Sequence, residues 1–284
     1  MKIGIGLSSQ VREVDATVIP AWAAKAEEAG FSTLGTVGRI AYPAVLDTVA
    51  LAAAAGATQT IGLLSTVMLA PVWPATLLAK ELAGIQAVSG GRLTFGVGVG
   101  GRPDDFVVEG TSTKGLGKRM DAALEAYRDL WSGKPVGGGD NAGVPGGSVE
   151  VPMLFGGFAP AALRRMARWG EGYVAGAMPA QQVVPVFDAA RAAWREEGRD
   201  GEPRLVAIAY FALGDVEKGR GNAHHYYSVA GPEYADLVSA GVNGSADVLR
   251  ETVKSFQDIG ADELIFHPTT DDVDDVARLA EIVL

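Results

Sequence analysis

Residues 96–101 (GVGVGG) have the spacing of a known phosphate-binding pattern. The glycines match G-x-G-x-x-G, which in dinucleotide-binding proteins joins a strand to a helix whose N-terminus meets the pyrophosphate. Here residues 102–106 (RPDDF) follow, and helical periodicity is expected only from about Lys118. The pattern also ends the fourth expected strand, whereas the fingerprint belongs to the first. We therefore expect Gly98 and Gly100 to let a flat ring or a phosphate approach the backbone, or to permit a turn with positive φ.

A second pair of glycines precedes a helix. Residues 155–161 (FGGFAPA) predict a strand end, two glycines and a helix with proline in its first turn. Free backbone N–H groups at such a corner, together with the helix dipole, bind anions. The corner therefore predicts a phosphate site at Gly156, Gly157, Phe158 and Ala159, although a plain tight turn between a strand and a helix has the same pattern.

Few side chains offer proton transfer, metal ligation or nucleophilic attack. The chain has three histidines and no cysteine, which excludes disulfides, thiolate metal sites and a cysteine nucleophile. His267 ends the last expected strand, where barrel enzymes place catalytic groups, but beside Pro268 it also suits a hydrogen-bonded turn. His224 and His225 are adjacent on a helix and point apart, so they do not form a metal pair. With Tyr226 and the next tyrosine they are candidates to bound a substrate cavity, although packing in the core or on the surface explains this stretch more simply.

Charge and hydropathy exclude several classes of partner. The chain of 284 residues carries 34 acidic and 24 basic side chains, and the net charge of −10 repels nucleic acid and anionic membranes. No apolar run reaches the ~18 residues of a membrane span, and the N-terminus predicts a strand, not a signal peptide. We therefore expect a cytoplasmic protein that acts on a small molecule, without nucleic acid or membrane.

Strands and helices alternate along the whole chain. Eight strands are expected, and several read as continuous apolar runs, which is typical of buried parallel sheet. The expected strands are residues 2–7, 33–37, 60–69, 93–99, 152–155, 172–175, 204–213 and 263–267. Eight strand–helix units predict an α/β fold of the (β/α)8 TIM-barrel type, one domain over residues 1–284 with insertion loops at the C-terminal face; a doubly wound sheet is the alternative. The glycine-rich residues 133–147 predict a surface insertion, and residues 214–259 a helical region of two segments.

Residues 77–110, which include SGGRLTFGVGVGG, resemble a hallmark of the bacterial luciferase-like superfamily of flavin- or deazaflavin-dependent enzymes. The resemblance extends over nearly the whole chain, through residues 26–37, 51–71, 120–133, 155–174 and 259–268. It implies a barrel with its cofactor at the C-terminal ends of the strands. It also implies that reduced flavin activates oxygen, or that a reduced deazaflavin passes hydride to a substrate.

The resemblance also implies particular cofactor contacts. Family members carry a bulge at the end of the third strand, often with a non-proline cis peptide that supports the ring; here this places Ser65, Thr66 and Val67 at the ring, with the cis bond at Thr66–Val67. The cofactor phosphate is expected at the 156–159 corner together with Gly176 and Ala177, which follow the next strand. Ordinary β-branched strand residues are the alternative explanation for Thr66 and Val67.

Two arginines stand where relatives carry proton-handling groups. Many deazaflavin-dependent relatives have an acidic residue and a histidine after the second strand, where this chain has Gly38 and Arg39; some have a glutamate near Gly101, where this chain has Arg102. Arg39 and Arg102, with His267, are the catalytic candidates, since an arginine can bind an anionic substrate or stabilise an oxyanion or charge at flavin N1. Ion pairs with the neighbouring Asp104 or Asp105 explain the arginines equally well.

These residues lead to three hypotheses. The first is an FMN-dependent monooxygenase that receives reduced FMN from a separate reductase. The second is a hydride-transferring oxidoreductase that uses the deazaflavin coenzyme F420, and the third is a flavin-binding relative without turnover. Relatives are commonly dimers, which implies a homodimer through the alanine-rich helix expected at residues 46–57.

Overall fold

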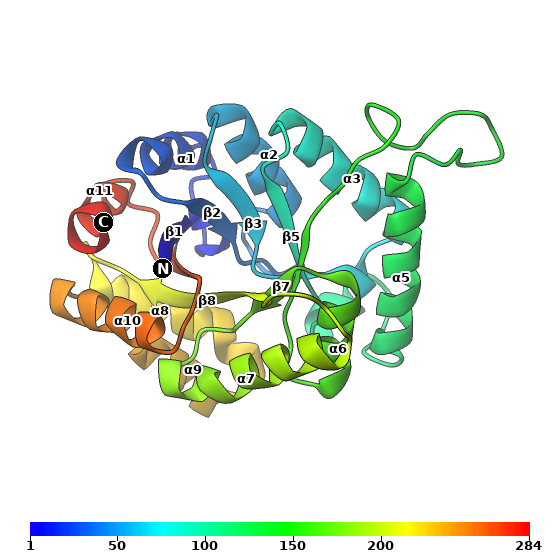
Figure 1. Cartoon of the computed structure of the whole chain (residues 1–284). Helices are drawn as coiled ribbons and strands as arrows, with labels where there is room; N and C mark the ends of the chain where they lie inside the picture. The colour runs from blue at the N-terminus through cyan, green and yellow to red at the C-terminus, as the bar shows by residue number, and fades with distance from the viewer.

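A computed structural model describes all residues from Met1 to Leu284, and its strands form a ring with helices outside it (Figure 1). The strands are β1 Lys2–Gly6, β2 Thr33–Thr36, β3 Gly62–Ser65, β4 Met68–Leu69, β5 Leu93–Gly98, β6 Met153–Phe155, β7 Gly172–Val174, β8 Arg204–Phe211 and β9 Glu263–Pro268. The helices are α1 Val18–Ala29, α2 Asp47–Ala57, α3 Ala75–Val88, α4 Pro103–Val107, α5 Leu116–Trp131, α6 Pro160–Trp169, α7 Ala180–Glu196, α8 Val216–Tyr227, α9 Pro232–Ala240, α10 Ala246–Asp258 and α11 Asp275–Val283.

All strand pairings are parallel, and the sheet closes on itself. The order runs β3-β2-β1-β9-β8-β7-β6-β5-β4, and β3 pairs with β5 as well. β3 and β4 are two parts of one barrel strand, because Leu64 pairs with Thr94 and Met68 with Val97, which leaves one extra residue between them. The (β/α)8 barrel is therefore confirmed, and the doubly wound alternative is wrong because no sheet edge stays open.

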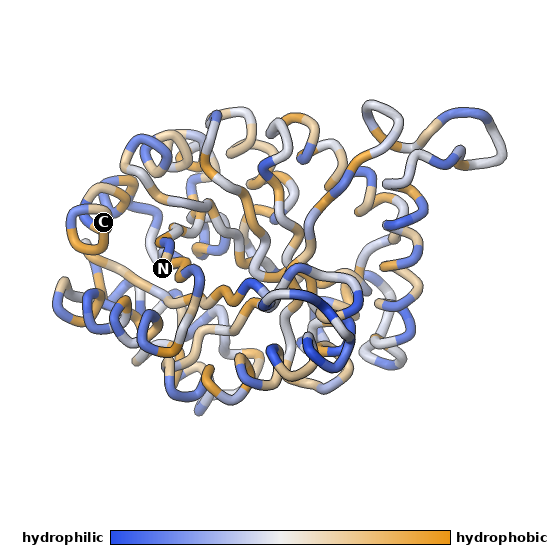
Figure 2. Tube along the Cα trace, viewed as in Figure 1, coloured by the Kyte–Doolittle hydropathy of each residue, from blue (hydrophilic) through white to orange (hydrophobic).

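Two layers of apolar side chains stabilise the barrel. Along β8, Leu205, Ala207 and Phe211 belong to the cluster between strands and helices, whereas Val206 and Ile208 belong to a second cluster with residues of the facing strands. This alternation is the period of two expected of a strand buried on both faces. In Figure 2 apolar and polar residues alternate along the surrounding helices, as expected when only one face of each helix packs on the sheet.

Two insertions at the C-terminal ends of the strands cover the barrel mouth. One joins β5 to α5 and contains α4; the other joins β8 to α10 and contains α8 and α9. The sequence did not predict α4, whose five residues are too few for a helical period, and it predicted two helical segments where α8, α9 and α10 form three. Gly231 and Pro232 separate α8 from α9, and a bridge from Phe211 to Asn243 separates α9 from α10.

The glycine-rich loop at residues 133–147 is a surface insertion, as expected. It joins α5 to β6 and projects beyond the ring of helices (Figure 1). A connection from a helix to the next strand lies at the end of the barrel opposite the mouth. None of the helices combines the length and apolar character that a membrane crossing requires.

Candidate functional site

The interrupted third strand forms one wall of the mouth. The peptide bond Thr66–Val67 is cis, as expected. The Ser65 hydroxyl donates to the Gly96 carbonyl at 2.8 Å, and the Thr66 hydroxyl donates to the Thr36 carbonyl at 2.8 Å. The bulge is thus bonded to both neighbouring strands, and the half-buried side chain of Val67 lies at the mouth.

The glycines of β5 make room for this bulge. A Cβ at Gly96 would lie 1.7 Å from the Ser65 carbonyl oxygen, and one at Gly98 would lie 2.8 Å from Val67 Cγ2. Gly156 packs on the other side of Val67, where a Cβ would be 3.2 Å from Cγ1. Gly100 has a φ of +74°, so its turn favours glycine. The glycine pattern therefore has a local packing reason, and contact of Gly98 and Gly100 with a cofactor stays a prediction.

His267 supports the bulge from inside the barrel. Its Nε2 lies 2.9 Å from Thr66 Oγ1, and Gly6 and Gly35 leave the space that the ring fills. The single Thr66 hydroxyl proton goes to the Thr36 carbonyl, so Nε2 carries hydrogen and donates to Thr66. Burial lowers the pKa of His267 to about 3, so the imidazole is neutral. Its geometry suits positioning of Thr66 and does not favour the proton exchange that its sequence position predicted.

Arg39 forms a buried ion-pair network. Its guanidinium pairs with Asp104 through Nη2 and with Asp105 at 3.6 Å from Nε, and Nη1 donates to the Tyr226 carbonyl at 3.0 Å. Asp105 also accepts the amides of Ile40 and the next residue at 2.9 and 2.8 Å. The ion-pair explanation is therefore confirmed for Arg39, and its charge is already matched inside the protein.

Arg102 has no carboxylate partner within ion-pair distance, although it stands next to α4 and its aspartates. The guanidinium carbon lies 5.0 Å from the ring centroid of Tyr226 and 5.1 Å from that of Tyr227, which is cation–π distance. The ion-pair explanation is therefore wrong for Arg102, and a half-buried cation faces the mouth.

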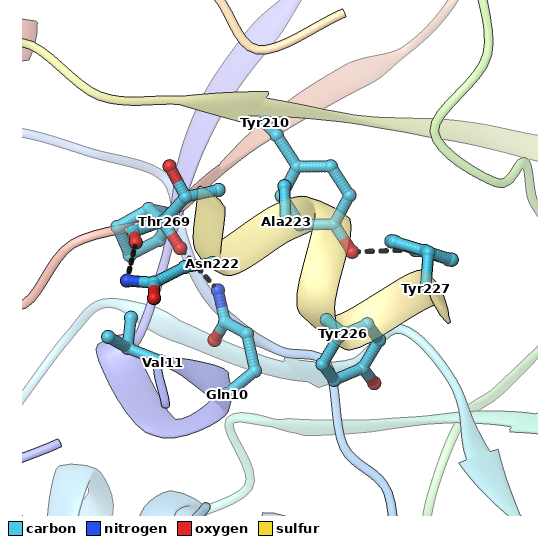
Figure 3. Close-up of a pocket in the computed structure, with 9 residues that line it drawn as sticks. Gln10, Val11, Tyr210, Asn222, Ala223, Tyr226, Tyr227 and Thr269 are labelled. Carbon is cyan, nitrogen blue, oxygen red and sulfur yellow. Dashed lines mark hydrogen bonds between the residues drawn. The ribbon is translucent and has the colours of Figure 1, made fainter. Parts of the chain in front are cut away.

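Tyrosines of α8, which follow His224 and His225 in the sequence, cover the mouth, and their contact with a substrate stays a prediction. Tyr210 and Tyr227 share a hydroxyl–hydroxyl bond of 2.8 Å, whereas the buried Tyr226 hydroxyl has no partner. They line a small cavity with Gln10 and Asn222 (Figure 3), whose free volume of about 10 Å³ has room for one water. Burial raises the pKa of both Tyr226 and Tyr227, so both are neutral phenols. The two histidines turn outward: His224 faces Asp236, and His225 faces Tyr42.

The strand–helix corner after β6 is open. The amides of Gly157, Phe158 and Ala159 make no hydrogen bond within the chain, and no side chain caps α6. Phe158 is 63% exposed, so it does not fill the corner, and its ring edge would be 3.9 Å from a Cβ at Gly176. The amides of Gly176 and Ala177 after β7 are likewise free, so two adjoining corners present free N–H donors at the mouth. These donors fit a phosphate group.

Asp47 is a site residue that the sequence did not indicate. It begins α2 but is only 5% exposed, and its Oδ1 has no partner. Its Oδ2 lies 1.9 Å from where a Cβ at Gly38 would stand, so any side chain at Gly38 would displace the carboxylate. Burial raises the pKa of Asp47 to about 6. An acidic residue in the first turn of a helix is normally solvent-exposed, so only the missing side chain at Gly38 hinted at this burial.

The structure is thus a (β/α)8 barrel with two adjoining corners of free amides and a bulged third strand. Residues 1–263 match the model of the family described as luciferase-like monooxygenase, and the chain belongs to that family. Family membership confirms the resemblance that the glycine-rich segments indicated. The family comprises flavin- or F420-dependent oxidoreductases and monooxygenases.

The chain is also similar to individual proteins, and the solved structures among them share its fold. The uncharacterized protein Rv0940c of Mycobacterium tuberculosis is 27% identical over 224 residues, 68% of this chain and 77% of its own. An F420-dependent secondary alcohol dehydrogenase superposes with a TM-score of 0.79 at 18% identity, covering 100% of this chain and 98% of its own. Monooxygenase RslO1 from Streptomyces bottropensis superposes with a TM-score of 0.78 at 23% sequence identity, covering 99% of this chain and 97% of its own. The FMN complex of the oxygenating constituent of 3,6-diketocamphane monooxygenase from Pseudomonas putida superposes with a TM-score of 0.75 at 17% sequence identity. It covers 100% of this chain and 95% of its own.

Proposed function

We propose that this chain is a flavin-dependent oxidoreductase, and specifically an FMN-dependent monooxygenase that acts on a small organic substrate. The observation that carries the proposal is the pair of open corners with free amides after β6 and β7. Gly157, Phe158 and Ala159 would hold the FMN phosphate, and Gly176 and Ala177 would add donors from the second corner. When bound, reduced FMN supplies the electrons that activate oxygen, and a separate reductase supplies the reduced FMN.

The remaining residues of the mouth orient groups and exclude water. Val67 offers an apolar surface beside the two corners, and the bonds of Thr66 to β2 and His267 hold that surface in place. The tyrosines of α8 cover the mouth and limit the access of water. Because Arg39 is neutralised and His267 is buried and neutral, oxygen chemistry carried by the cofactor suits this site better than acid–base catalysis by the protein.

A deazaflavin-dependent hydride transfer is the second candidate. It is supported by the TM-score of 0.79 with an F420-dependent secondary alcohol dehydrogenase and by the buried carboxyl of Asp47 beside Gly38. Coenzyme F420 would use the same corners, and the exposed Arg164 on α6 offers positive charge for its acidic tail.

Side-by-side titration separates the candidates. We expect FMN, or FMN reduced under argon, to quench tryptophan fluorescence with a Kd on the order of 1–10 μM, and F420 to bind at least about tenfold more weakly. We also expect the bound protein to change the rate at which reduced FMN consumes oxygen. Tighter binding of F420 would favour hydride transfer, binding without any change in oxygen consumption would favour a flavin-binding relative without turnover, and binding of neither cofactor would refute the proposal.

We further propose that two chains associate through α2 and α3. Val49, Leu77 and Val88 are exposed on these neighbouring helices, and Gly56 and Gly84 have no atoms near their missing side chains. Such a flat apolar face suits close helix packing across a two-fold axis.

Val49→Glu is expected to convert the dimer to a monomer, because it places a charge in a desolvated contact. Analytical ultracentrifugation at about 10 μM chain, where a dimer with a Kd below about 1 μM is still associated, would measure the change. Val248→Glu makes the same substitution at an exposed valine on α10 and should leave the mass unchanged. A monomeric wild type, or a dimeric Val49→Glu protein, would contradict the assignment.

A further inference from the structure

Arg102 is a half-buried cation whose counter-ion is missing. Every other arginine that is not exposed forms a hydrogen bond or an ion pair with the protein. These residues are Arg39, Arg92, Arg119, Arg165, Arg191, Arg199, Arg204 and Arg220. The chain carries ten more acidic than basic side chains, yet no carboxylate lies within ion-pair distance of Arg102.

The nearest carboxylates are occupied elsewhere. Asp104 pairs with Arg39, and Asp105 pairs with Arg39 while accepting two amides from the loop after β2. The guanidinium of Arg102 approaches the Tyr227 hydroxyl and no carboxylate, so its other N–H donors remain for a group that enters the mouth. A guanidinium fork matches the two oxygens of a carboxylate in one plane.

The surroundings of Arg102 suit a flat ligand. Its guanidinium lies against Tyr226 and Tyr227, whose ring centroids are 5.1 Å apart in an edge-on arrangement. Tyr42 adds a third ring 4.9 Å from Tyr226. These are contacts within the protein, and a planar ligand would extend the aromatic cluster beyond the small cavity by offset or edge-to-face contact.

Polar groups near the rings remain unused. The Tyr226 hydroxyl is buried without a partner, and Gln10 Oε1 is likewise unpartnered while its amide nitrogen bonds the Pro268 carbonyl (Figure 3). A buried donor or acceptor without a partner is rare in a folded protein. The Tyr226 hydroxyl and Gln10 Oε1 would form hydrogen bonds with a polar substituent on the bound ring.

We propose that the substrate is a planar aromatic acid whose carboxylate pairs with Arg102 while its ring lies against Tyr226 and Tyr227. The proposal deepens the proposed function, because it names the substrate class for the same mouth. It distinguishes Arg102 from Arg39, whose charge is matched, and assigns Arg102 to the substrate instead of to the cofactor.

The test compares a matched pair of probes, benzoate and the neutral benzamide, by ligand-observed NMR on the full chain with and without FMN. We expect benzoate to bind at least about tenfold more tightly than benzamide. Arg102→Gln should reduce the ratio of benzoate affinity to benzamide affinity to less than about twofold, and Arg102→Lys should keep part of this preference. Arg220→Gln removes the same charge from α8, where Arg220 pairs with Glu217, and should keep the wild-type ratio. Equal thermal midpoints would show that the variants are folded.

Three outcomes would overturn the proposal: equal affinity for the two probes, a preference for benzoate that survives in Arg102→Gln, or binding of neither probe. A fourth separates the roles of Arg102, since a loss of FMN affinity in Arg102→Gln with no change in the probe ratio would assign this arginine to the cofactor. The probe ratio is measured without FMN as well. Failure of the substrate assignment is therefore distinguishable from failure of the flavin assignment.

Discussion

Ala159→Asp is expected to stabilise the fold and, in the same protein, to weaken FMN binding by about 100-fold. Ala159 is the N-cap of α6 and caps nothing, so an aspartate there accepts a hydrogen bond from the free Ala161 amide of the first turn and adds about 1 kcal/mol of stability. The new carboxylate lies beside the Gly157, Phe158 and Ala159 amides that are proposed to hold the phosphate. Its negative charge repels the phosphate from this corner, which weakens one or two charge-assisted hydrogen bonds of about 1.5–3 kcal/mol each.

The variant is expected to raise the stability of the fold while lowering the affinity for FMN, so a general loss of folding cannot explain the result. Stability is measured by urea unfolding and affinity by fluorescence titration on the same preparation. Ala159→Asn has nearly the shape of the aspartate without its charge, so it should stabilise α6 similarly and weaken FMN by only about tenfold or less. An Ala159→Asp protein that is more stable and binds FMN with wild-type affinity would show that the phosphate lies elsewhere.

The sequence predicted the corner because it is local, whereas the bulge was implied by the family resemblance. A pair of glycines between an apolar strand and a proline-led helix determines the direction of the free amides within a few residues. The fold was predictable for a similar reason, since eight buried strands separated by helices leave few closed arrangements. The resemblance supplied the cis bond at Thr66–Val67, which the residue types alone do not indicate.

What the sequence could not predict depends on contacts between distant segments. The purpose of Gly96 and Gly98 becomes evident only when β3 and β5 are paired with one extra residue between Leu64 and Met68. The different environments of Arg39 and Arg102 depend on α4, which is too short to show a helical period. With α4 in place, both aspartates turn toward the second strand, so one arginine is neutralised and the other is left without a partner.

Asp47→Asn is expected to remove a pH dependence of stability worth about 3 kcal/mol. The unfolded chain releases this proton near pH 3.8, whereas burial keeps it on the folded protein up to about pH 6. Between these values the folded state binds more protons, so the free energy of unfolding falls as the pH rises. About two pH units at 1.36 kcal/mol each give the stated amount, and the loss is complete above about pH 7. The wild type therefore carries at neutral pH a destabilisation that the asparagine variant lacks.

Urea unfolding of both proteins from pH 4.5 to 8 measures the difference, in which the titration of all other groups cancels. Asp140→Asn, in the exposed glycine-rich loop, makes the same substitution in water and should run parallel to the wild type. Parallel curves for Asp47→Asn and the wild type would mean that solvent or an unseen donor reaches the carboxylate. If the difference between the two free energies of unfolding instead shrinks as the pH falls, a protonated carboxyl lies between Gly38 and the apolar side chains of Met68 and Trp73. Such a group would lose its proton near pH 6, close to the mouth.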